Sequence, residues 1–451
     1  MIQSSLNPEA LAPIVGLLKQ ANDYFSTIYP GESERRQAVH TVYGGGHLFK
    51  ADTTGKLGVV ALRSLAIHAP DSIKLSKILG ADWQPPFAEK IYQRIVEKLN
   101  REPIEDFRLD YEDGYGNRPD AEEDEHAAQG ARQVAAGFAA GSLPPFIGIR
   151  IKPFNEDLRT RSIRTLDIFI TTLVQETGGK LPSDFVVTLP KVQMPAQVTA
   201  AIAILALLEK KLGLSHGSIP LEPMIETPQS IISQEGICPL LPIVRAAEGR
   251  CRSVHFGVYD YTASSGITAA YQAMGHPACD FARAHMIVSL AGTGVHLSDG
   301  ATNILPVGPH RGEGLSTEQL LQNSAAVHDA WRLGYQDNRH SLRNGIYQGW
   351  DLHPAQFVAR YAAVYGFFLE GLEAASGRLK AFVEKAALAS LFGDVFDDAA
   401  TGQGLLNFFL RGIACGAITE AEALETGLTL EEIRSRSFFR ILEKRRGDGS
   451  F

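Results

Sequence analysis

The chain has 451 residues, of which 45% are hydrophobic, and its formal net charge at pH 7 is -8. A barrel of alternating strands and helices takes about 250 residues, so this length fits one large barrel with additions as well as two domains. The negative charge argues against nucleic acid or an anionic membrane surface as the main partner.

The cysteines and the N-terminus indicate the compartment. Cys238, Cys251, Cys279 and Cys415 are far apart and form no CxxC pair, which argues against a zinc site or a disulfide framework. No basic segment followed by an apolar core opens the sequence, and no run approaches the roughly 18 apolar residues of a membrane helix. We expect a cytoplasmic enzyme without a membrane anchor.

Apolar residues at helical spacing, Leu11, Ile14, Leu17 and Leu18, predict a helix near the N-terminus after a Ser or Asn cap. Short apolar or β-branched runs that end in polar residues then predict eight strands. These runs are residues 40–43, 106–112, 146–151, 184–190, 221–226, 253–258, 294–299 and 345–352.

Helical periodicity fills the intervals between these runs, for example in residues 161–175, 195–212, 278–292 and 354–372. Strands that alternate with helices pair in parallel through right-handed crossovers, and eight such units predict a closed (β/α)8 TIM barrel. The long interval 44–105 predicts an insertion after the first strand. The expected domains are an N-terminal helical extension (1–38), the catalytic barrel (39–376) and a C-terminal helical region without strands (377–451).

Catalytic groups of such barrels lie where the strands end, and polar residues gather there in this sequence. Acidic and basic groups that converge on one rim need a metal ion or an anionic substrate to compensate them. The residues concerned are Asp110, Glu112, Asp113, Arg150, Lys152, Lys191, Glu226, Asp260, Asp299, Asp351 and His353.

Each of these residues also has a structural interpretation. Glu226 precedes a Thr-Pro helix start and Asp260 suits a turn cap, so either carboxylate could serve only the local backbone. The acids between 110 and 113 could form a solvated loop edge, and His353 before a proline is best explained as a helix cap. Arg150 differs, because an arginine inside an apolar run calls for an anionic partner.

Three glycines at 44–46 end the first strand and are followed by His47 and Lys50. A backbone without side chains can approach an anionic ligand closely, although a tight turn explains these glycines equally well.

Seven segments occur in the order found in one superfamily of barrels. They are LDYEDG, IRI, TLPKV, IETP, FGVYD, SDGA and GWDLHPAQ, spread over residues 40–356. On these segments the chain resembles the citrate lyase β-subunit-like and HpcH/HpaI aldolase superfamily of phosphoenolpyruvate/pyruvate-binding barrels, and within it an extended bacterial subgroup.

The resemblance implies that Glu226 and Asp260 bind Mg²⁺, for which Mn²⁺ can substitute. It also implies that Arg150 pairs with the substrate carboxylate or with the enolate oxygen that develops during the reaction. Oxygen ligands without cysteine suit these hard cations better than zinc. A small carboxylate substrate, which could be a coenzyme A thioester, and a homo-oligomeric assembly are expected as well.

The remaining rim residues are expected to bind substrate, namely Lys152, Lys191, Asp110, Glu112 and Asp113. Where the superfamily often has Arg-x-Asn, this chain has Arg150-Ile-Lys152, which suggests an extra carboxylate or a phosphate on the substrate. The resemblance implies that the general base is either His47 or the acidic segment with Asp394, Asp397 and Asp398, contributed by a neighbouring subunit. Histidine titrates in the useful range, so His47 is preferred.

Three functions follow from these residues. The first is a metal-dependent carbon–carbon lyase or aldolase that acts on a 3-hydroxy acid or its thioester. The second is a phosphotransferase that uses phosphoenolpyruvate or pyruvate, with Lys152 and Lys191 on the phosphate, although the sequence has no GxxxxGK[ST] loop. The third is a barrel that binds a carboxylate without catalysis.

Overall fold

The computed structural model describes residues 5–31, 33, 35–384, 390–392, 395–397 and 399–447. At its centre is a closed barrel of eight parallel strands in sequence order, with β8 paired to β1. This confirms the (β/α)8 class and all eight expected strands. The strands are β1 (His40–Gly45), β2 (Asp106–Asp110), β3 (Phe146–Arg150), β4 (Phe185–Leu189), β5 (Leu221–Ile225), β6 (Ser253–Phe256), β7 (His296–Ala301) and β8 (Gln348–Asp351).

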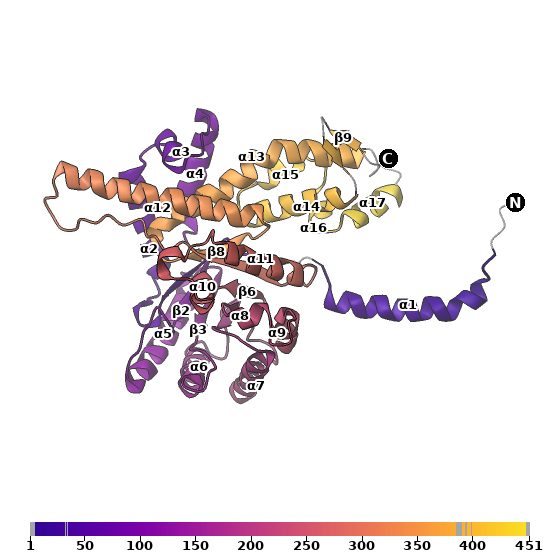
Figure 1. Ribbon diagram of the computed structural model, residues 1–451, viewed down its shortest axis with the longest axis horizontal. Coiled ribbons are helices and arrows are strands. Elements are labelled where there is room, and N and C mark those ends of the chain that lie inside the picture. The colour runs from indigo at the N-terminus through magenta and orange to yellow at the C-terminus, as the bar shows by residue number, and fades with distance from the viewer. Residues whose placement is uncertain are drawn as a thin grey trace.

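Helices surround the barrel, and α12 and α13 lie on the side opposite to α5, α6 and α7 (Figure 1). The interval after β1 holds the expected insertion. The elements that connect the strands are η1 (Gly46–Leu48), α2 (Thr53–His68), α3 (Ser72–Leu79), α4 (Pro85–Arg101), α5 (Asp120–Ala140), α6 (Arg159–Glu176), α7 (Pro195–Leu212), α8 (Pro228–Ile231), α9 (Leu240–Ala246), α10 (Val258–Ser264), η2 (Ala269–Tyr271), α11 (Pro277–Leu290), α12 (Thr317–Arg343) and η3 (Pro354–Gln356).

The C-terminal region begins with the long helix α13 (Phe357–Glu384), and its further elements are β9 (Ser390–Phe392), β10 (Val395–Asp397), α14 (Ala399–Ala414), α15 (Glu420–Leu424), α16 (Leu430–Arg434) and α17 (Phe438–Gly447). The expectation of helices without strands is wrong here, because β9 and β10 pair as an antiparallel hairpin. In the sequence a Gly-Asp pair separates two short apolar runs, and this is a hairpin signal that outweighs the helical propensity of the preceding alanines.

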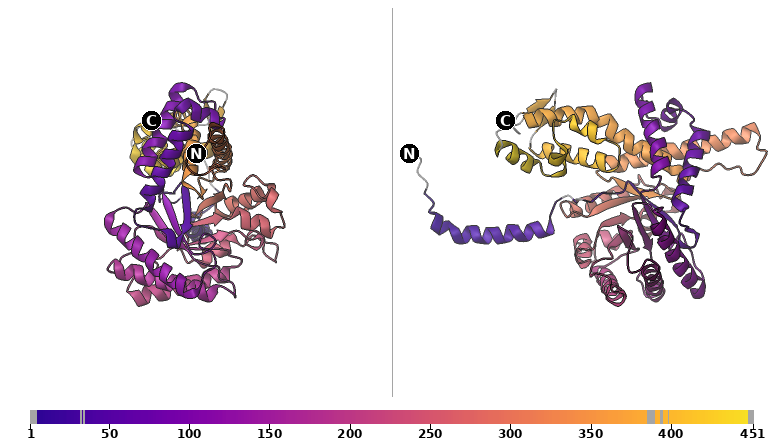
Figure 2. Two further views of the ribbon diagram at one scale, coloured as in Figure 1. Left: turned by 90° about the vertical axis from the view of Figure 1, so that its left-hand side faces the viewer. Right: turned by 180° about the vertical axis from the view of Figure 1, so that it is seen from behind.

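The N-terminal helix α1 (Pro8–Ile28) extends away from the rest of the molecule (Figures 1 and 2). Asn7 caps it by accepting a hydrogen bond from the backbone N–H of Glu9 at 2.9 Å. None of its residues is buried. Among the described residues, no helix combines the length and the apolar character needed to cross a membrane.

The two faces of the strands differ in chemistry. Phe107 and Leu109 of β2 face outward into the apolar core shared with the helices, and Phe107 packs against Phe49 with ring centroids 5.0 Å apart. Arg108 and Asp110, which alternate with them along the strand, face the barrel interior, where they contact Glu222 and Arg150. The hydrophobic effect therefore acts mainly outside the barrel, and its interior holds polar groups.

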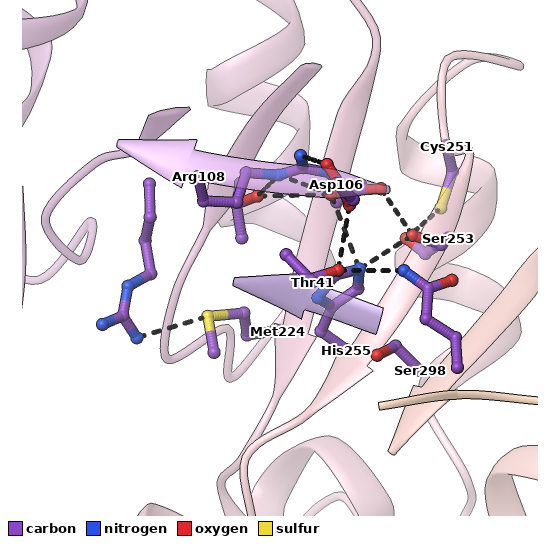
Figure 3. A network of polar contacts seen from close by, with 12 residues as sticks. Thr41, Asp106, Arg108, Met224, Cys251, Ser253, His255 and Ser298 are labelled. Carbon is purple, nitrogen blue, oxygen red and sulfur yellow. Dashed lines mark hydrogen bonds and ion pairs between the residues drawn. The ribbon is translucent and has the colours of Figure 1, made fainter. Parts of the chain in front are cut away.

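A buried polar network fills the interior of the barrel (Figure 3). Arg108 Nη2 donates to Glu222 Oε2 at 2.6 Å, and Arg108 Nη1 donates to Asp106. Ser253 Oγ donates to the other oxygen of Glu222 at 2.6 Å. Burial raises the pKa of Glu222, but the charges of Arg108 and His255 and the hydrogen bonds from His255 and Ser253 together outweigh burial and hold this pKa well below its ordinary value.

Arg108→Met is expected to lower the free energy of unfolding by about 3–5 kcal/mol at pH 7, because two buried carboxylates lose their counter-charge. The loss should shrink at pH 5, where those carboxylates can take up protons. Urea denaturation at both pH values tests this, with exposed Arg63→Met as the control, expected within about 0.5 kcal/mol of the wild type. Equal stability of Arg108→Met and the wild type would contradict it.

Candidate active site

The side chain of Arg150 is the centre of the site at the carboxyl ends of the strands. It is 4% exposed, and it pairs with Asp110 through two hydrogen bonds, Nε to Oδ1 at 2.7 Å and Nη2 to Oδ2 at 2.5 Å. Asp110 also accepts from the backbone N–H groups of Glu112 at 3.0 Å and Gly114 at 2.7 Å. Burial raises the pKa of Asp110, yet these contacts lower it overall, so the pair stays ionised.

The face of the Arg150 guanidinium packs against Tyr43 of β1, whose ring centroid lies 4.8 Å from the Arg150 Cζ. The Tyr43 hydroxyl bonds to His255 Nδ1 at 2.9 Å, which joins the site to the buried network below. Tyr43 and Asp110 together fix the plane of the guanidinium. Its Nη1 lies 3.0 Å from Glu112 Oε2 and 3.7 Å from Asp113, so this nitrogen faces the acidic part of the site.

Lys191, just after β4, lies among the carboxylates. Its Nζ contacts Glu112 Oε1 and lies 3.4 Å from both Asp113 and Asp260. Its backbone N–H donates to Glu226 Oε1 at 2.6 Å. Lys191 has φ 52°, the left-handed conformation, which costs free energy in a residue with a side chain and is found disproportionately at functional sites.

Glu226 follows β5 and is 1% exposed. Gly257 gives it space, because a Cβ at position 257 would lie 2.1 Å from Glu226 Oε2. Burial, together with the charges of Glu112 and Asp260, raises the pKa of Glu226 to about 8. Burial and the charge of Asp113 raise that of Glu112 to about 7.

The predicted metal ligands therefore share one acidic site with Arg150 and Lys191. Glu112 Oε2 is buried and makes no hydrogen bond, although it is close enough to Arg150 for an ionic contact. A buried carboxylate oxygen without a hydrogen-bond donor, beside a second carboxylate whose pKa its charge raises, suits a hard divalent cation. Within the described residues no three His, Cys, Asp or Glu side chains already converge as ligands, and the Lys191 ammonium lies among the carboxylates instead.

Two other predicted residues lie in separate contacts. Lys152 Nζ donates to Glu123 Oε2 of α5 at 2.7 Å and to the Tyr111 carbonyl at 2.6 Å, so α5 already compensates its charge. His47 packs against Tyr115 and lies 3.3 Å from Arg118 Nη2.

The state of His47 bears on its expected role as a base. Burial and the charge of Arg118 lower its pKa, which leaves the ring neutral at pH 7. Its Nδ1 is buried, and in the described part of the chain it has no hydrogen-bond partner. For the alternative base, Asp394 and Asp398 lie outside the described residues, and of Asp397 only its place at the end of β10 is described.

Other polar residues at strand ends have structural partners. Asp299 pairs with Arg283 at 2.8 Å, and Asp351 pairs with His40 at 2.6 Å. His353 accepts from the backbone N–H of Ala355 at 3.2 Å and caps η3, as the sequence suggested. The sequence analysis did not identify Tyr43, which contacts Arg150. Side chains alternate along a strand, so Tyr43 lies on the same face of β1 as the polar residue Thr41, and this pattern could have placed it inside the barrel.

Comparisons with known proteins support the fold. A family model described as "Domain of unknown function (DUF6986)" matches residues 18–441. A comparison with curated proteins gave no match. Among solved structures, a citrate lyase from Burkholderia xenovorans LB400 is 17% identical with a TM-score of 0.52, over 74% of this chain and 92% of that one. A malate synthase from Haloferax volcanii is 13% identical with a TM-score of 0.47, over 90% and 98%.

Without metal, the protein is expected to lose stability as the pH rises from about 5 to about 8. The folded-state pKa of Glu226 lies above its unfolded value, so this group stabilises the fold at low pH, and that contribution is lost as the pH rises through the folded pKa. Glu226→Gln should flatten the decline, because the amide does not titrate. Urea denaturation in EDTA at several pH values measures this, and exposed Glu235→Gln is the control. Parallel curves for wild type and Glu226→Gln would contradict the assignment.

Proposed function

The chain belongs to the DUF6986 family, and from the site described above we propose that it is a metal-dependent carbon–carbon lyase or aldolase. Its substrate would be a 3-hydroxy acid, free or as a coenzyme A thioester. The bond between C2 and C3 breaks, the C3 hydroxyl becomes a carbonyl, and the electron pair stays on the C2 fragment as an enolate. Proton transfer to C2 then completes the reaction.

The observation that carries this proposal is the fixed position of Arg150 beside the acidic site. Asp110 and Tyr43 hold its guanidinium on two sides, while Nη1 is directed toward Glu112 and Asp113. A donor fixed before the reaction stabilises charge that develops on an enolate oxygen without having to reorganise. The same nitrogen can bind the carboxylate of the substrate through a charge-assisted hydrogen bond.

The residues that would hold Mg²⁺ or Mn²⁺ are Glu226 and Asp260. When bound, the cation supplies Lewis-acid stabilisation of the enolate oxygen. The Lys191 ammonium competes with a cation for the oxygens of Glu112 and Asp260, because it contacts both. The raised pKa of Glu226 makes metal affinity increase with pH, since a ligand carboxylate must lose its proton.

For the proton of the C3 hydroxyl we assign His47 as base, since its ring is neutral at pH 7. Arg118 can only donate to His47 Nε2, so this nitrogen carries the lone pair and Arg118 would have to release it for the proton transfer. The acidic segment around Asp397 of a neighbouring subunit is the alternative. Either role fits a cytoplasmic homo-oligomer, which is part of the proposal. The substrate contacts would come from Arg150, Lys191, Asp110, Glu112 and Asp113.

The structure weakens the support for the two competing functions. Phosphate binding by Lys152 and Lys191 would require Lys152 to leave Glu123, with which it is buried. A barrel that only binds a carboxylate has no evident need for a glutamate of raised pKa next to a fixed arginine. The barrel shared with the Burkholderia protein titled citrate lyase agrees with a lyase at the level of the fold.

Deuterium incorporation into the methyl group of acetyl-coenzyme A, followed by NMR in D₂O with Mg²⁺, tests formation of the enolate at C2 without knowledge of the carbonyl product. Wild-type protein should catalyse the exchange, whereas Glu226→Gln and Asp260→Asn should not, with Glu235→Gln as a control of wild-type activity. The same samples with phosphoenolpyruvate and ATP test phosphotransfer by phosphorus NMR. Exchange that continues without metal and in both site variants would refute the proposal.

Arg150→Lys tests the arginine separately. Lysine keeps the charge but cannot form the fork to Asp110, so the exchange rate should fall about 100- to 1000-fold, the usual effect of losing one donor to a developing oxyanion. Arg63→Lys on the exposed face of α2 should leave the rate unchanged. A fall of less than threefold in Arg150→Lys would remove Arg150 from the mechanism.

A further inference from the structure

A cavity lies at the opposite end of the barrel from the proposed active site. Its volume is about 1170 Å³, and its wall includes Arg252 and Val295, which directly precede β6 and β7. The wall also includes the end of α1 and the residues after it, part of α9 and of α14, and the junction of α16 and α17. Figure 1 shows α1 leaving the molecule at the end where α16 and α17 lie.

Five arginines from separate parts of the chain line this cavity, namely Arg35, Arg245, Arg252, Arg436 and Arg440. Among its described lining residues there is no aspartate or glutamate. The whole chain carries a net charge of -8, so this concentration of positive charge runs against its overall composition. The cavity is open to solvent on one side, and a concave surface that carries mainly one sign of charge attracts ligands of the opposite sign.

The arginines also affect one another. The pKa of Arg252 is lowered, first by burial and then by the charge of Arg35. In the adjoining wall, burial and the charges of Arg411, Arg35 and Arg436 lower the pKa of His296 to about 4. Repulsion between these like charges costs free energy, and a bound anion would reduce that cost.

The chemistry of arginine selects the class of anion. A guanidinium donates through a planar fork that matches phosphate or carboxylate oxygens in pairs. Within the described residues, no carboxylate lies within ion-pair distance of Arg35, Arg245 or Arg252, whereas Arg150 and Arg108 in the barrel are paired with acids. Several guanidinium groups around one space match two adjacent phosphates better than one carboxylate.

We propose that this cavity binds a small molecule that carries a diphosphate group, with Arg35, Arg252 and Arg245 as its main contacts. The volume exceeds that of a diphosphate and leaves room for an attached organic group. Arg35 and Arg252 also line a smaller cavity, about 100 Å³, that reaches Asp106 and Glu222 at the floor of the barrel. The site is independent of the lyase proposal, since none of its residues belongs to the active site.

Isothermal titration of the full chain with inorganic pyrophosphate, in EDTA and at two salt concentrations, tests this proposal. Saturable binding is expected, weaker at the higher salt concentration. Arg35→Gln combined with Arg252→Gln should weaken it at least tenfold, and the matched Arg35→Lys with Arg252→Lys should retain part of it. Arg63→Gln, on the far helix α2, and Glu226→Gln, in the active site, should bind as wild type does.

A wild-type protein that does not bind pyrophosphate would overturn the proposal. Unchanged binding in the Arg35 and Arg252 glutamine variant would overturn it too. Circular dichroism checks that this variant folds. If it does not fold, Arg440→Gln on the exposed side of α17 is tested instead. This variant should bind pyrophosphate at least threefold more weakly than the wild type, and an unchanged affinity would overturn the proposal.

Discussion

The pairing of Arg150 with Asp110 is the contact on which the rest of the site depends. Both charges are removed from water at the end of the barrel, and a buried ion pair of this kind seldom adds net stability. Its value lies in geometry, because the fork fixes the guanidinium and Asp110 also accepts from the backbone at residues 112 and 114. The loop that carries Glu112 is therefore shaped by the carboxylate that holds Arg150.

The polar interior extends this constraint through the barrel. Tyr43 packs on Arg150 and bonds to His255, and His255 Nε2 lies 3.0 Å from Ser253 Oγ in the network of Arg108 and Glu222. Opposite charges in this interior keep one another ionised, while the apolar contacts that stabilise the fold lie between strands and helices. A change deep in the barrel can thus alter the site without a large change in the outer core.

The sequence predicted the strands well because each is an apolar run that ends in a polar residue, as expected for strands covered by helices. It located Arg150 and Glu226 for the same reason, since polar residues at strand ends mark the rim. It could not tell that Lys191 lies in the site whereas Lys152 does not, because both lysines follow strand ends. The difference lies in Glu123 of α5, which binds Lys152, and in the left-handed backbone of Lys191, and neither is visible in local sequence.

Local sequence also does not show which of the other acidic residues at the strand ends have a basic partner. Asp299 and Asp351 fit the strand-end pattern as well as Glu226 does, but Arg283 and Arg360 of neighbouring helices bind them. Whether a carboxylate at the rim is available for a ligand depends on a basic residue elsewhere in the chain, and only the packed structure shows which acids have one. For β9 and β10, the alanines before the hairpin favoured a helix and concealed a turn signal of two residues.

The packing of Gly257 against Glu226 limits which mutations position 257 can accept. Every single-nucleotide change in a glycine codon that is not silent gives a residue with a Cβ or a stop codon, and every such Cβ would meet the carboxylate of Glu226. Position 257 therefore has no neutral single-step replacement as long as Glu226 keeps its present place. In a mutational scan of this gene, the position would be as intolerant as a catalytic residue, although its side chain takes part in no chemistry.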